Sequence, residues 1–536
     1  NSTKAEVFMK KYDYLVIGSG AANITTDAAI DAGKKVAIIE KAKFAGTCLN
    51  RGCIPTKTLV NPVDYKKDFE RLKSKGLAKG EFELDWQAIS ERMWNHLNHY
   101  SQKTMTDYIA EENVDVYQGT GYFVREKVVQ VKLKDGTVSE EMTADHILIA
   151  NGARTRIPDN IEGLDQIDYI TSETFFGNKF PEQPYKSLTI LGGGPIATEF
   201  AHIFANWGTK VTIIQHNPRL LPIFDPDISE IVLEEYAAEN IDVYLNTEMI
   251  AVEEQDGIKK ITIEDRETGA KNILEAENLF LATGLASNSD TLQIEKSGIA
   301  TNEFGWIKTN EFLETSVDGV YAIGDANGKF QLRHVANYEA EIVAFNLFER
   351  ARDESGKPLT PRRRARYDVV PSAVYTQPQV SGVGFNTKTA EDHGYQVTTG
   401  IYAYEYTSKP FAMGYDFAKP KHFVKVIADK LTQRILGVQV VGPEAAILVQ
   451  LYANLINTGY YKYEIIEPEI GSAETKRERQ EFKERYLDPR ITDAVNYTMT
   501  IHPALSEVST WASSRVEFDG PTMNAEQPDC EPNKKK

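Results

Sequence analysis

Two of the three cysteines in this chain lie in one short run, with four residues between them. The run reads Gly46-Thr47-Cys48-Leu49-Asn50-Arg51-Gly52-Cys53-Ile54-Pro55-Thr56-Lys57. On a helix, this spacing puts the two sulfurs about one and a half turns apart, and a distorted first turn brings them within disulfide range. A helix N-terminus also lowers the pKa of a thiol, and the thiolate is the species that reacts in thiol–disulfide exchange. The spacing therefore predicts that the two cysteines act as a pair.

Other interpretations of the pair are a structural disulfide, two core thiols and a metal site. Disulfide-stabilised scaffolds are short and rich in cysteine, whereas this chain has 3 cysteines in 536 residues. No further Cys or His lies nearby at the spacing of a metal site, so no metal is expected. We therefore interpret Cys48 and Cys53 as a redox-active pair.

The charge balance argues against a nucleic-acid-binding protein. The chain has 60 Lys and Arg against 78 Asp and Glu, a net charge of -18, and a binding site for nucleic acid is usually basic. The one basic cluster, Arg362-Arg363-Arg364, is interpreted as a solvated linker. No apolar run approaches the ~20 residues that span a bilayer, and no signal peptide is recognised. We expect a cytoplasmic protein, with residues 1–8 as an extension before Met9.

A first dinucleotide-binding unit lies before the cysteine pair. The apolar run 14–17 leads into Gly18-Ser19-Gly20, and a predicted helix and second strand follow, ending in Glu40. Gly18 allows the tight turn, and Gly20 lets a pyrophosphate approach the helix N-terminus. Glu40 is placed to accept a hydrogen bond from a ribose hydroxyl. Asn23 occupies the third fingerprint position, where Gly or Ala is usual.

A second unit contains the complete fingerprint, Gly192-Gly193-Gly194-Pro195-Ile196-Ala197, after the apolar strand 188–191. Its second strand ends in Gln215, where an acid would favour NAD and arginines would favour NADP. The cofactor is therefore written NAD(P)H, with a slight preference for NADPH because no carboxylate repels a 2′-phosphate. Ala282-Thr283-Gly284 closes the unit.

Two fingerprints predict two dinucleotides, and the cysteine pair follows the first. A nicotinamide does not readily reduce a disulfide directly, and a flavin is the usual intermediary. We therefore expect FAD on the first unit and NAD(P)H on the second.

Four later features have both a functional and a structural interpretation. Gly324-Asp325 ends a strand, where the acid either holds a ribityl hydroxyl or forms a simple turn. The charged insertion 471–490 has helical spacing and is interpreted as a solvated helix or an oligomer-specific element. His502 with Glu507 forms an oriented general base or a structural pair. The tail 524–536 is expected to be disordered, with Cys530 as an incidental exposed thiol.

From about Tyr12 to Ser513 the chain resembles the class I pyridine nucleotide–disulfide oxidoreductases, the family of glutathione reductase and dihydrolipoamide dehydrogenase. The cysteine signature is the most specific element, and Ala282-Thr283-Gly284, Gly324-Asp325 and His502-Pro503 through Glu507 follow in the family's order. Three stretches look most like mycothione reductase: Gln331-Leu332-Arg333-His334-Val335-Ala336-Asn337, Val370-Pro371-Ser372-Ala373-Val374 and Ile501-His502-Pro503-Ala504-Leu505.

The resemblance implies a role for each residue. Cys53 would be the flavin-proximal thiolate and Cys48 the thiol that exchanges with substrate. Lys57 would pair with Glu199 near the flavin. His502 and Glu507 would act as acid and base in the partner subunit's site, which makes the homodimer obligatory. The resemblance and the fingerprints together assign FAD binding to Gly18, Gly20, Glu40, Thr47, Lys57, Gly324 and Asp325, and NAD(P) binding to Gly192, Gly194, Ala197, Gln215 and Gly284.

The resemblance also implies an α/β fold, with two Rossmann-like dinucleotide-binding domains (FAD and NAD(P)) plus a C-terminal α+β dimerisation domain. The expected ranges are 9–158 and 286–365 for FAD, 159–285 for NAD(P), and 366–523 for dimerisation with an insertion at about 467–497.

The expected activity is FAD-dependent reduction of a low-molecular-weight thiol disulfide by NAD(P)H. Dihydrolipoamide dehydrogenase, which runs the relay in reverse, is the main alternative. Mercuric reductase and NADH oxidase are weaker ones, since mercuric reductase typically has a C-terminal cysteine pair and this chain has only Cys530 there.

Overall fold

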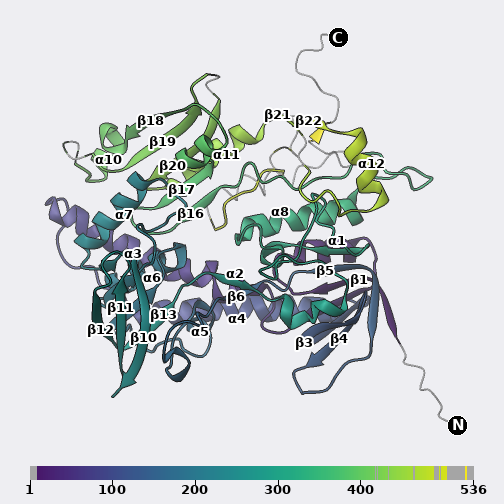
Figure 1. Cartoon of the computed structure of the whole chain (residues 1–536), viewed down its shortest axis with the longest axis horizontal. Coiled ribbons are helices and arrows are strands. Elements are labelled where there is room, and N and C mark those ends of the chain that lie inside the picture. Colours follow the sequence, from purple (N-terminus) through teal and green to yellow (C-terminus); the bar gives the residue numbers. More distant parts are fainter. Residues whose placement is uncertain are drawn as a thin grey trace.

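The computed structural model describes residues 9–416, 418, 420–431, 434–462, 465–487, 494, 497–503 and 526–527. Figure 1 shows two α/β lobes side by side, with a further sheet above the left-hand lobe. The chain starts in the right-hand lobe, passes to the left-hand lobe, returns to the first and then enters the upper sheet. Within these ranges, no helix combines the length and the apolar character needed to cross a membrane.

The first lobe is built on a six-stranded sheet. Its strands are β1 (Lys10–Ile17), β2 (Val36–Glu40), β3 (Val114–Arg125), β4 (Val128–Leu133), β5 (Met142–Ile149) and β15 (Val320–Ala322). β1 pairs in parallel with both β2 and β5. Every residue of β2 is buried, as expected for a parallel strand covered on both faces. Because β15 pairs with β5, the chain returns to this sheet after the second lobe.

A glycine makes the first turn of this lobe possible. Gly18 follows β1 with φ +106, and a Cβ there would lie 2.2 Å from the carbonyl oxygen of Ala150. The turn leads into α1 (Asn23–Asp31), which packs against α8 (Arg333–Ala344), where Thr25 Oγ1 donates to Ala340 O at 2.9 Å. The glycine loop between β1 and α1 is thus held in the tight form that the fingerprint predicts.

The second lobe contains the complete fingerprint. A parallel sheet has the order β13 (Asn278–Leu281), β7 (Ser187–Leu191), β8 (Lys210–Ile214), β9 (Asp242–Tyr244), with helices α6 (Pro195–Asn206) and α7 (Pro226–Ala238). An antiparallel sheet of β10 (Thr247–Gln255), β11 (Ile258–Asp265) and β12 (Lys271–Ala276) adjoins it. The sequence analysis did not anticipate this second sheet.

Three helices connect β2 to β3 and pass between the lobes: α2 (Gly46–Arg51), α3 (Cys53–Ser74) and α4 (Trp86–Ala110). Asp85 caps α4 by accepting a hydrogen bond from the backbone N–H of Ala88 at 2.9 Å. α3 packs against α6 of the second lobe. The helix that begins at Cys53 therefore joins the two lobes.

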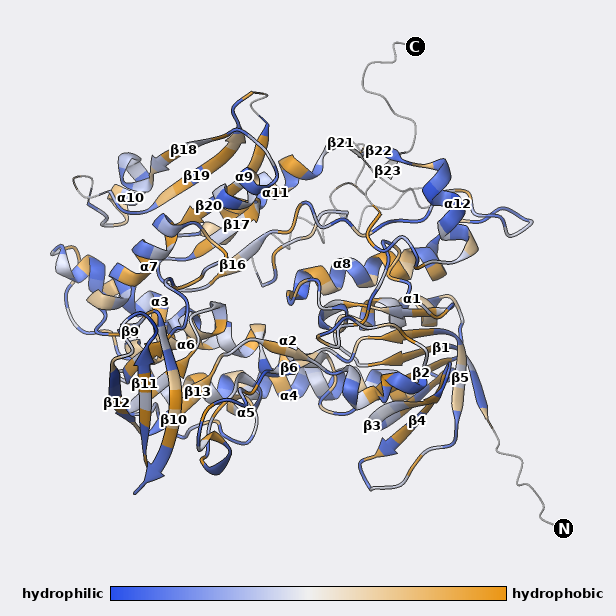
Figure 2. Cartoon of the chain, viewed as in Figure 1, coloured by the Kyte–Doolittle hydropathy of each residue, from blue (hydrophilic) through white to orange (hydrophobic). Residues whose placement is uncertain are grey.

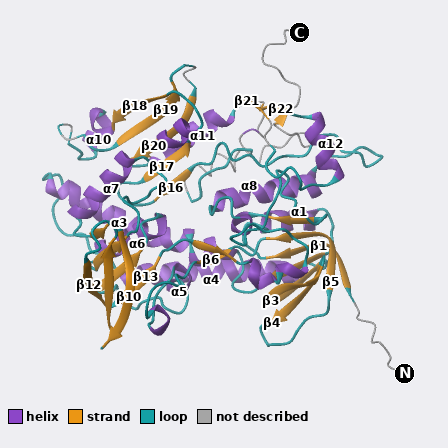
Figure 3. Cartoon of the chain, viewed as in Figure 1, coloured by secondary structure: helices purple, strands orange, loops and turns teal. Residues whose placement is uncertain are grey.

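The upper sheet is antiparallel, in the order β16 (Ser372–Val374), β17 (Val380–Gly384), β20 (Ile435–Val441), β19 (Phe423–Asp429), β18 (Val397–Ala403). Figure 3 shows α11 (Ala445–Asn457) beside it. The shorter elements are β6 (Ala153–Thr155), α5 (Ser172–Phe175), β14 (Leu285–Ser287), α9 (Thr387–Asp392), α10 (Ser408–Ala412), β21 (Gly459–Lys462), α12 (Ala473–Glu481), β22 (Glu484–Leu487) and β23 (Glu526–Gln527).

The arginine cluster is buried, so its interpretation as a solvated linker is wrong. Arg362, Arg363 and Arg364 are only 5%, 8% and 2% exposed. Arg362 donates to Glu314 at 2.8 Å, and its guanidinium lies 3.8 Å from the centre of the Phe312 ring. Opposite charge and aromatic faces compensate the cost of removing these cations from water.

The insertion supplies part of the same buried network. Figure 2 shows α12 as mostly hydrophilic, yet one of its faces is buried against the first lobe. Arg479 forms a bidentate ion pair with Glu311 at 2.8 Å, and Thr475 donates to Glu314 at 2.5 Å. The buried charges of α12 pair with residues that lie more than a hundred positions earlier in the chain, and only the opposite face of the helix is exposed to solvent.

This burial predicts that replacing Arg479 lowers the stability of the protein strongly, whereas replacing Arg477 on the same helix hardly changes it. Arg479→Ala should lower the free energy of unfolding by about 3 kcal/mol, because the fully buried Glu311 carboxylate loses this ion pair. Arg477→Ala on the same helix is the matched control. Arg477 is exposed and should change stability by less than about 0.5 kcal/mol. Urea unfolding of both variants checks the difference, and equal losses would contradict the buried ion pair.

Candidate active site

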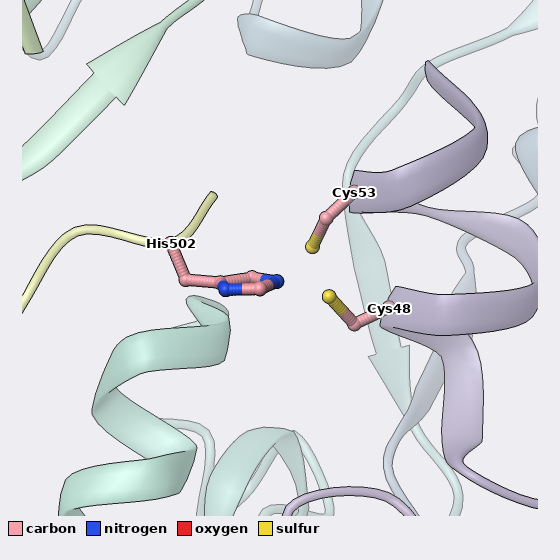
Figure 4. Close-up of side chains that lie close together, drawn as sticks. All are labelled: Cys48, Cys53 and His502. Carbon is pink, nitrogen blue, oxygen red and sulfur yellow. The ribbon is translucent and has the colours of Figure 1, made fainter. Parts of the chain in front are cut away.

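A cavity of about 520 Å³ lies where both lobes and the C-terminal segment meet. Its wall combines the glycine loop after β1, the cysteine run, the start of α6, the start of α8 and residues 501–503. Figure 4 shows Cys48, Cys53 and His502 facing one another. The two sulfurs and one ring nitrogen of His502 all lie within 4.8 Å of one another.

The two cysteines approach because the helix breaks between them. α2 ends at Arg51, α3 begins at Cys53, and Gly52 between them has φ -140 and ψ -108. A Cβ on Gly52 would lie 3.2 Å from the carbonyl oxygen of Thr47, so a larger residue would crowd the break. The distortion expected from the sequence is thus a complete interruption of the helix, which brings the second sulfur back towards the first.

The two thiols have opposite acid strengths. A hydrogen bond from Cys48, assisted by the positive charges of Lys57 and Arg333, lowers the pKa of Cys53 to about 6. Burial, with the hydrogen bond to Cys53, raises the pKa of Cys48 well above its usual value. In the dithiol state the pair therefore consists of a Cys53 thiolate and a Cys48 thiol at neutral pH.

Lys57 lies one turn along α3 from Cys53 and forms an ion pair with the second lobe. Its Nζ is 2.6 Å from Oε2 of Glu199 on α6, the partner expected from the sequence. The other carboxylate oxygen of Glu199 accepts from the backbone N–H of Tyr375 at 2.8 Å, and the Lys57 ammonium lies 4.6 Å from the centre of the Tyr375 ring. The ion pair is thereby held at the junction of the two lobes.

His502 lies in the site of its own chain. The segment before it is anchored there by buried Met499 and Ile501, and the backbone N–H of Ile501 donates to Gln450 Oε1 at 3.1 Å. The hydroxyl of Tyr375 donates to Pro503 O at 2.5 Å. The sequence analysis expected His502 in the partner subunit's site. Its expected partner Glu507, like Cys530 and all but two residues of the tail, lies outside the described residues.

The residues expected to bind FAD meet in the same cavity. Gly18, Gly20, Glu40, Thr47, Lys57, Gly324 and Asp325 all line it. Glu40 holds the glycine loop, because its carboxylate accepts from the backbone N–H and the hydroxyl of Ser19 at 3.0 and 2.7 Å. Burial and the nearby charges of Cys53 and Glu339 raise the pKa of Asp325 to about 7. A carboxyl in this setting suits a ligand hydroxyl, so the cavity fits FAD.

A second cavity of about 520 Å³ contains four of the five residues expected to bind NAD(P). Gly192, Gly194, Gln215 and Gly284 line it, whereas Ala197 is fully buried inside α6. Ala197 therefore serves the close packing of helix on strand. The side chain of Gln215 donates to Arg219 O at 3.1 Å and covers Gly193, where a Cβ would lie 2.8 Å from it.

Sequence reasoning missed two residues that line the site, and it missed that the site could bind a metal ion. Tyr375 and Arg333 line the cavity, and Arg333 stands in a stretch quoted only for its family likeness. Cys48, Cys53 and His502 also form the one group of three candidate metal ligands found among the described residues. The expectation of no metal considered ligand spacing along the chain, whereas the fold brings His502 from the far end of the sequence.

Residues 12–340 match the family model "Pyridine nucleotide-disulphide oxidoreductase", and residues 370–473 match its dimerisation domain. A mercuric reductase of Staphylococcus aureus is 30% identical, over 81% of this chain and 75% of that protein. A mycothione reductase of Mycobacterium tuberculosis is also 30% identical, over 82% and 92%.

A solved structure shares the fold. The Cu(II) complex of the HOCl-induced flavoprotein disulfide reductase RclA from Escherichia coli has 25% sequence identity and a TM-score of 0.70. The match covers 95% of this chain and 100% of that chain.

The acidity of Cys53 predicts a pH profile. In the reduced apoprotein with Cys530→Ser, alkylation of Cys53 by iodoacetamide should reach half its maximal rate near pH 6, because the thiolate is the nucleophile. Lys57→Met should move this midpoint upward, since a stabilising cation is lost. Mass spectrometry of the alkylated peptide gives the rate, with Cys48 as the internal control that reacts only at higher pH. A Cys53 midpoint near the ~8.5 of an ordinary thiol would contradict the assignment.

Proposed function

Because this chain belongs to the pyridine nucleotide–disulphide oxidoreductase family, we propose that it reduces a small-molecule disulfide through Cys48 and Cys53. The enzyme uses FAD and NAD(P)H, as its family does. The meeting of Cys48, Cys53 and His502 in the cavity that fits FAD carries the proposal. When bound, FAD supplies the two-electron chemistry that connects a nicotinamide to the cysteine disulfide.

The first half of the reaction uses Cys48 as the nucleophile. His502 takes the proton of the Cys48 thiol, and the resulting thiolate attacks one sulfur of the substrate disulfide. A mixed disulfide forms on Cys48, and the leaving thiolate receives the proton from His502. Burial raises the pKa of Cys48 and keeps its thiol protonated before substrate arrives. Cys48 therefore needs His502 as a proton acceptor.

The second half uses the charge already present on Cys53. The Cys53 thiolate attacks Cys48 Sγ, which forms the Cys48–Cys53 disulfide and releases the second substrate thiolate. That thiolate takes up a proton to leave as a thiol. The sum is one substrate disulfide and one dithiol converted to two thiols and one enzyme disulfide. Two electrons from NAD(P)H then restore the dithiol.

The substrate class that we favour is a low-molecular-weight thiol disulfide, as in a mycothione reductase, with dihydrolipoamide as the alternative in the reverse direction. A thiophilic metal ion is a second candidate substrate. It is supported by two thiols and an imidazole within 4.8 Å of one another and by the names of a relative, mercuric reductase, and of the solved Cu(II) complex. Two relatives with equal identity bear the names of different substrates, so identity alone does not choose between them.

We further propose a homodimer. Residues 370–473 match the family's dimerisation domain, and α11 within that range exposes Leu451 and Leu455, with 65% and 58% of their surface accessible. Burying such side chains against a second copy is favourable, at about 25 cal/mol per Å² of apolar surface.

An anaerobic titration tests the relay. We expect NADH or NADPH to produce a long-wavelength absorbance from the Cys53 thiolate beside the flavin, and one candidate substrate to discharge it. The candidates are low-molecular-weight disulfides, lipoamide, Hg(II) and Cu(II). Cys48→Ser should abolish disulfide turnover while NAD(P)H still reduces the flavin, and Cys530→Ser is the matched control with normal turnover. Full disulfide turnover by Cys48→Ser would sink the relay, and NAD(P)H consumption by this variant with oxygen alone would favour the oxidase alternative.

A mixed dimer tests which chain supplies the imidazole. His502→Ala should lower turnover by about 10²–10⁴-fold, as expected for loss of a general acid–base group. One Cys48→Ser chain and one His502→Ala chain, carrying different tags, are then purified as a heterodimer. The structure predicts no restored activity, because each His502 serves its own cysteines. Recovery of about half the wild-type activity, one site of two, would mean that the partner subunit supplies the imidazole, as the sequence analysis expected.

A further inference from the structure

Arg333 is the first residue of α8 and points into the FAD cavity without an assigned role. The helix starts there with no side-chain cap, and Arg333 lines the same cavity as the glycine loop and the cysteine pair. Its charge lowers the pKa of both Cys48 and Cys53. Arg333 thus shares one cavity with the dinucleotide loop and the reacting sulfurs.

The guanidinium of Arg333 lies beside the glycine loop. Nη1 of Arg333 lies 3.7 Å from the position that a Cβ on Gly20 would take. Gly20 belongs to the loop at the N-terminus of α1, where the backbone of such a fingerprint receives a diphosphate. Arg333 therefore reaches the part of the cavity where negative charge is expected.

Two other cations on the cavity wall are engaged in ion pairs. Lys57 is paired with Glu199 at 2.6 Å, and Arg154 with Asp290 at 2.8 Å. Among the described residues, no carboxylate forms an ion pair with Arg333 and no acceptor takes a hydrogen bond from it. The Glu40 carboxylate on the same cavity wall accepts hydrogen bonds from Ser19 of the glycine loop and does not pair with Arg333. The positive charge of Arg333 remains available for a ligand.

We propose that Arg333 binds the diphosphate of FAD, and so acts as a positioning residue that α8 contributes to a site built mainly by the glycine loop of α1. The proposal rests on FAD as the occupant of this cavity. A guanidinium suits the task, because its planar donors match phosphate oxygens and its charge persists at every working pH. The two helices α1 and α8, which pack together through Thr25 and Ala340, would then hold one ligand group between their N-termini.

Binding to the apoprotein tests this without any turnover. FAD, ADP and riboflavin are titrated separately: ADP has the diphosphate without the flavin, and riboflavin has the flavin without phosphate. Arg333→Gln should weaken FAD and ADP by about tenfold or more, the loss expected for a hydrogen bond to a charged group. Riboflavin should bind as it does to the wild type. Arg333→Lys should retain part of the affinity as a point charge.

The controls separate this result from general damage. Arg352→Gln makes the same substitution at an exposed surface position and should leave all three affinities unchanged, and thermal unfolding of each apoprotein checks the fold. Unchanged FAD and ADP affinity in Arg333→Gln would overturn the proposal, as would an equal loss of riboflavin. Wild-type apoprotein that binds none of the three would instead refute FAD as the occupant. The ADP titration decides the outcome even if riboflavin binds too weakly to measure.

Discussion

The close approach of the Cys48 and Cys53 sulfurs, which lie within 4.8 Å of each other, is the constraint on which the site depends. It exists because the helix breaks at Gly52, and it separates two chemically identical groups into an acid and a base. Basic side chains then approach Cys53 from separate parts of the chain. Lys57 comes from α3, Arg333 from α8 and His502 from the C-terminal segment. The thiolate of Cys53 is thus stabilised by side chains from elements that lie hundreds of residues apart in the sequence.

The architecture explains how such distant elements meet. Ligands of open α/β sheets bind at the carboxyl ends of the parallel strands, and here the ends of β1, β2 and β15 lead into residues that line one cavity. The helix α3 extends from this cavity to the second lobe, where Lys57 forms its ion pair with Glu199 of α6.

The insertion is tied to the first lobe by buried charges. α12 is bound there through Arg479 and Glu311. Buried ion pairs contribute less to net stability than to fixing one arrangement, since removing either partner is costly. A helix that looked solvated by composition therefore has one face inside the protein.

The sequence by itself determined the local parts of this protein. The cysteine run and both glycine fingerprints depend on backbone geometry over a few residues, which residue type alone dictates. The pairing of Lys57 with Glu199 came only from family resemblance. Burial of Arg362–Arg364, the free guanidinium of Arg333 beside Gly20 and the position of His502 in its own chain were decided by tertiary structure. Each depends on a partner far away in sequence, and no local periodicity or spacing records which distant charge or cavity a side chain will meet.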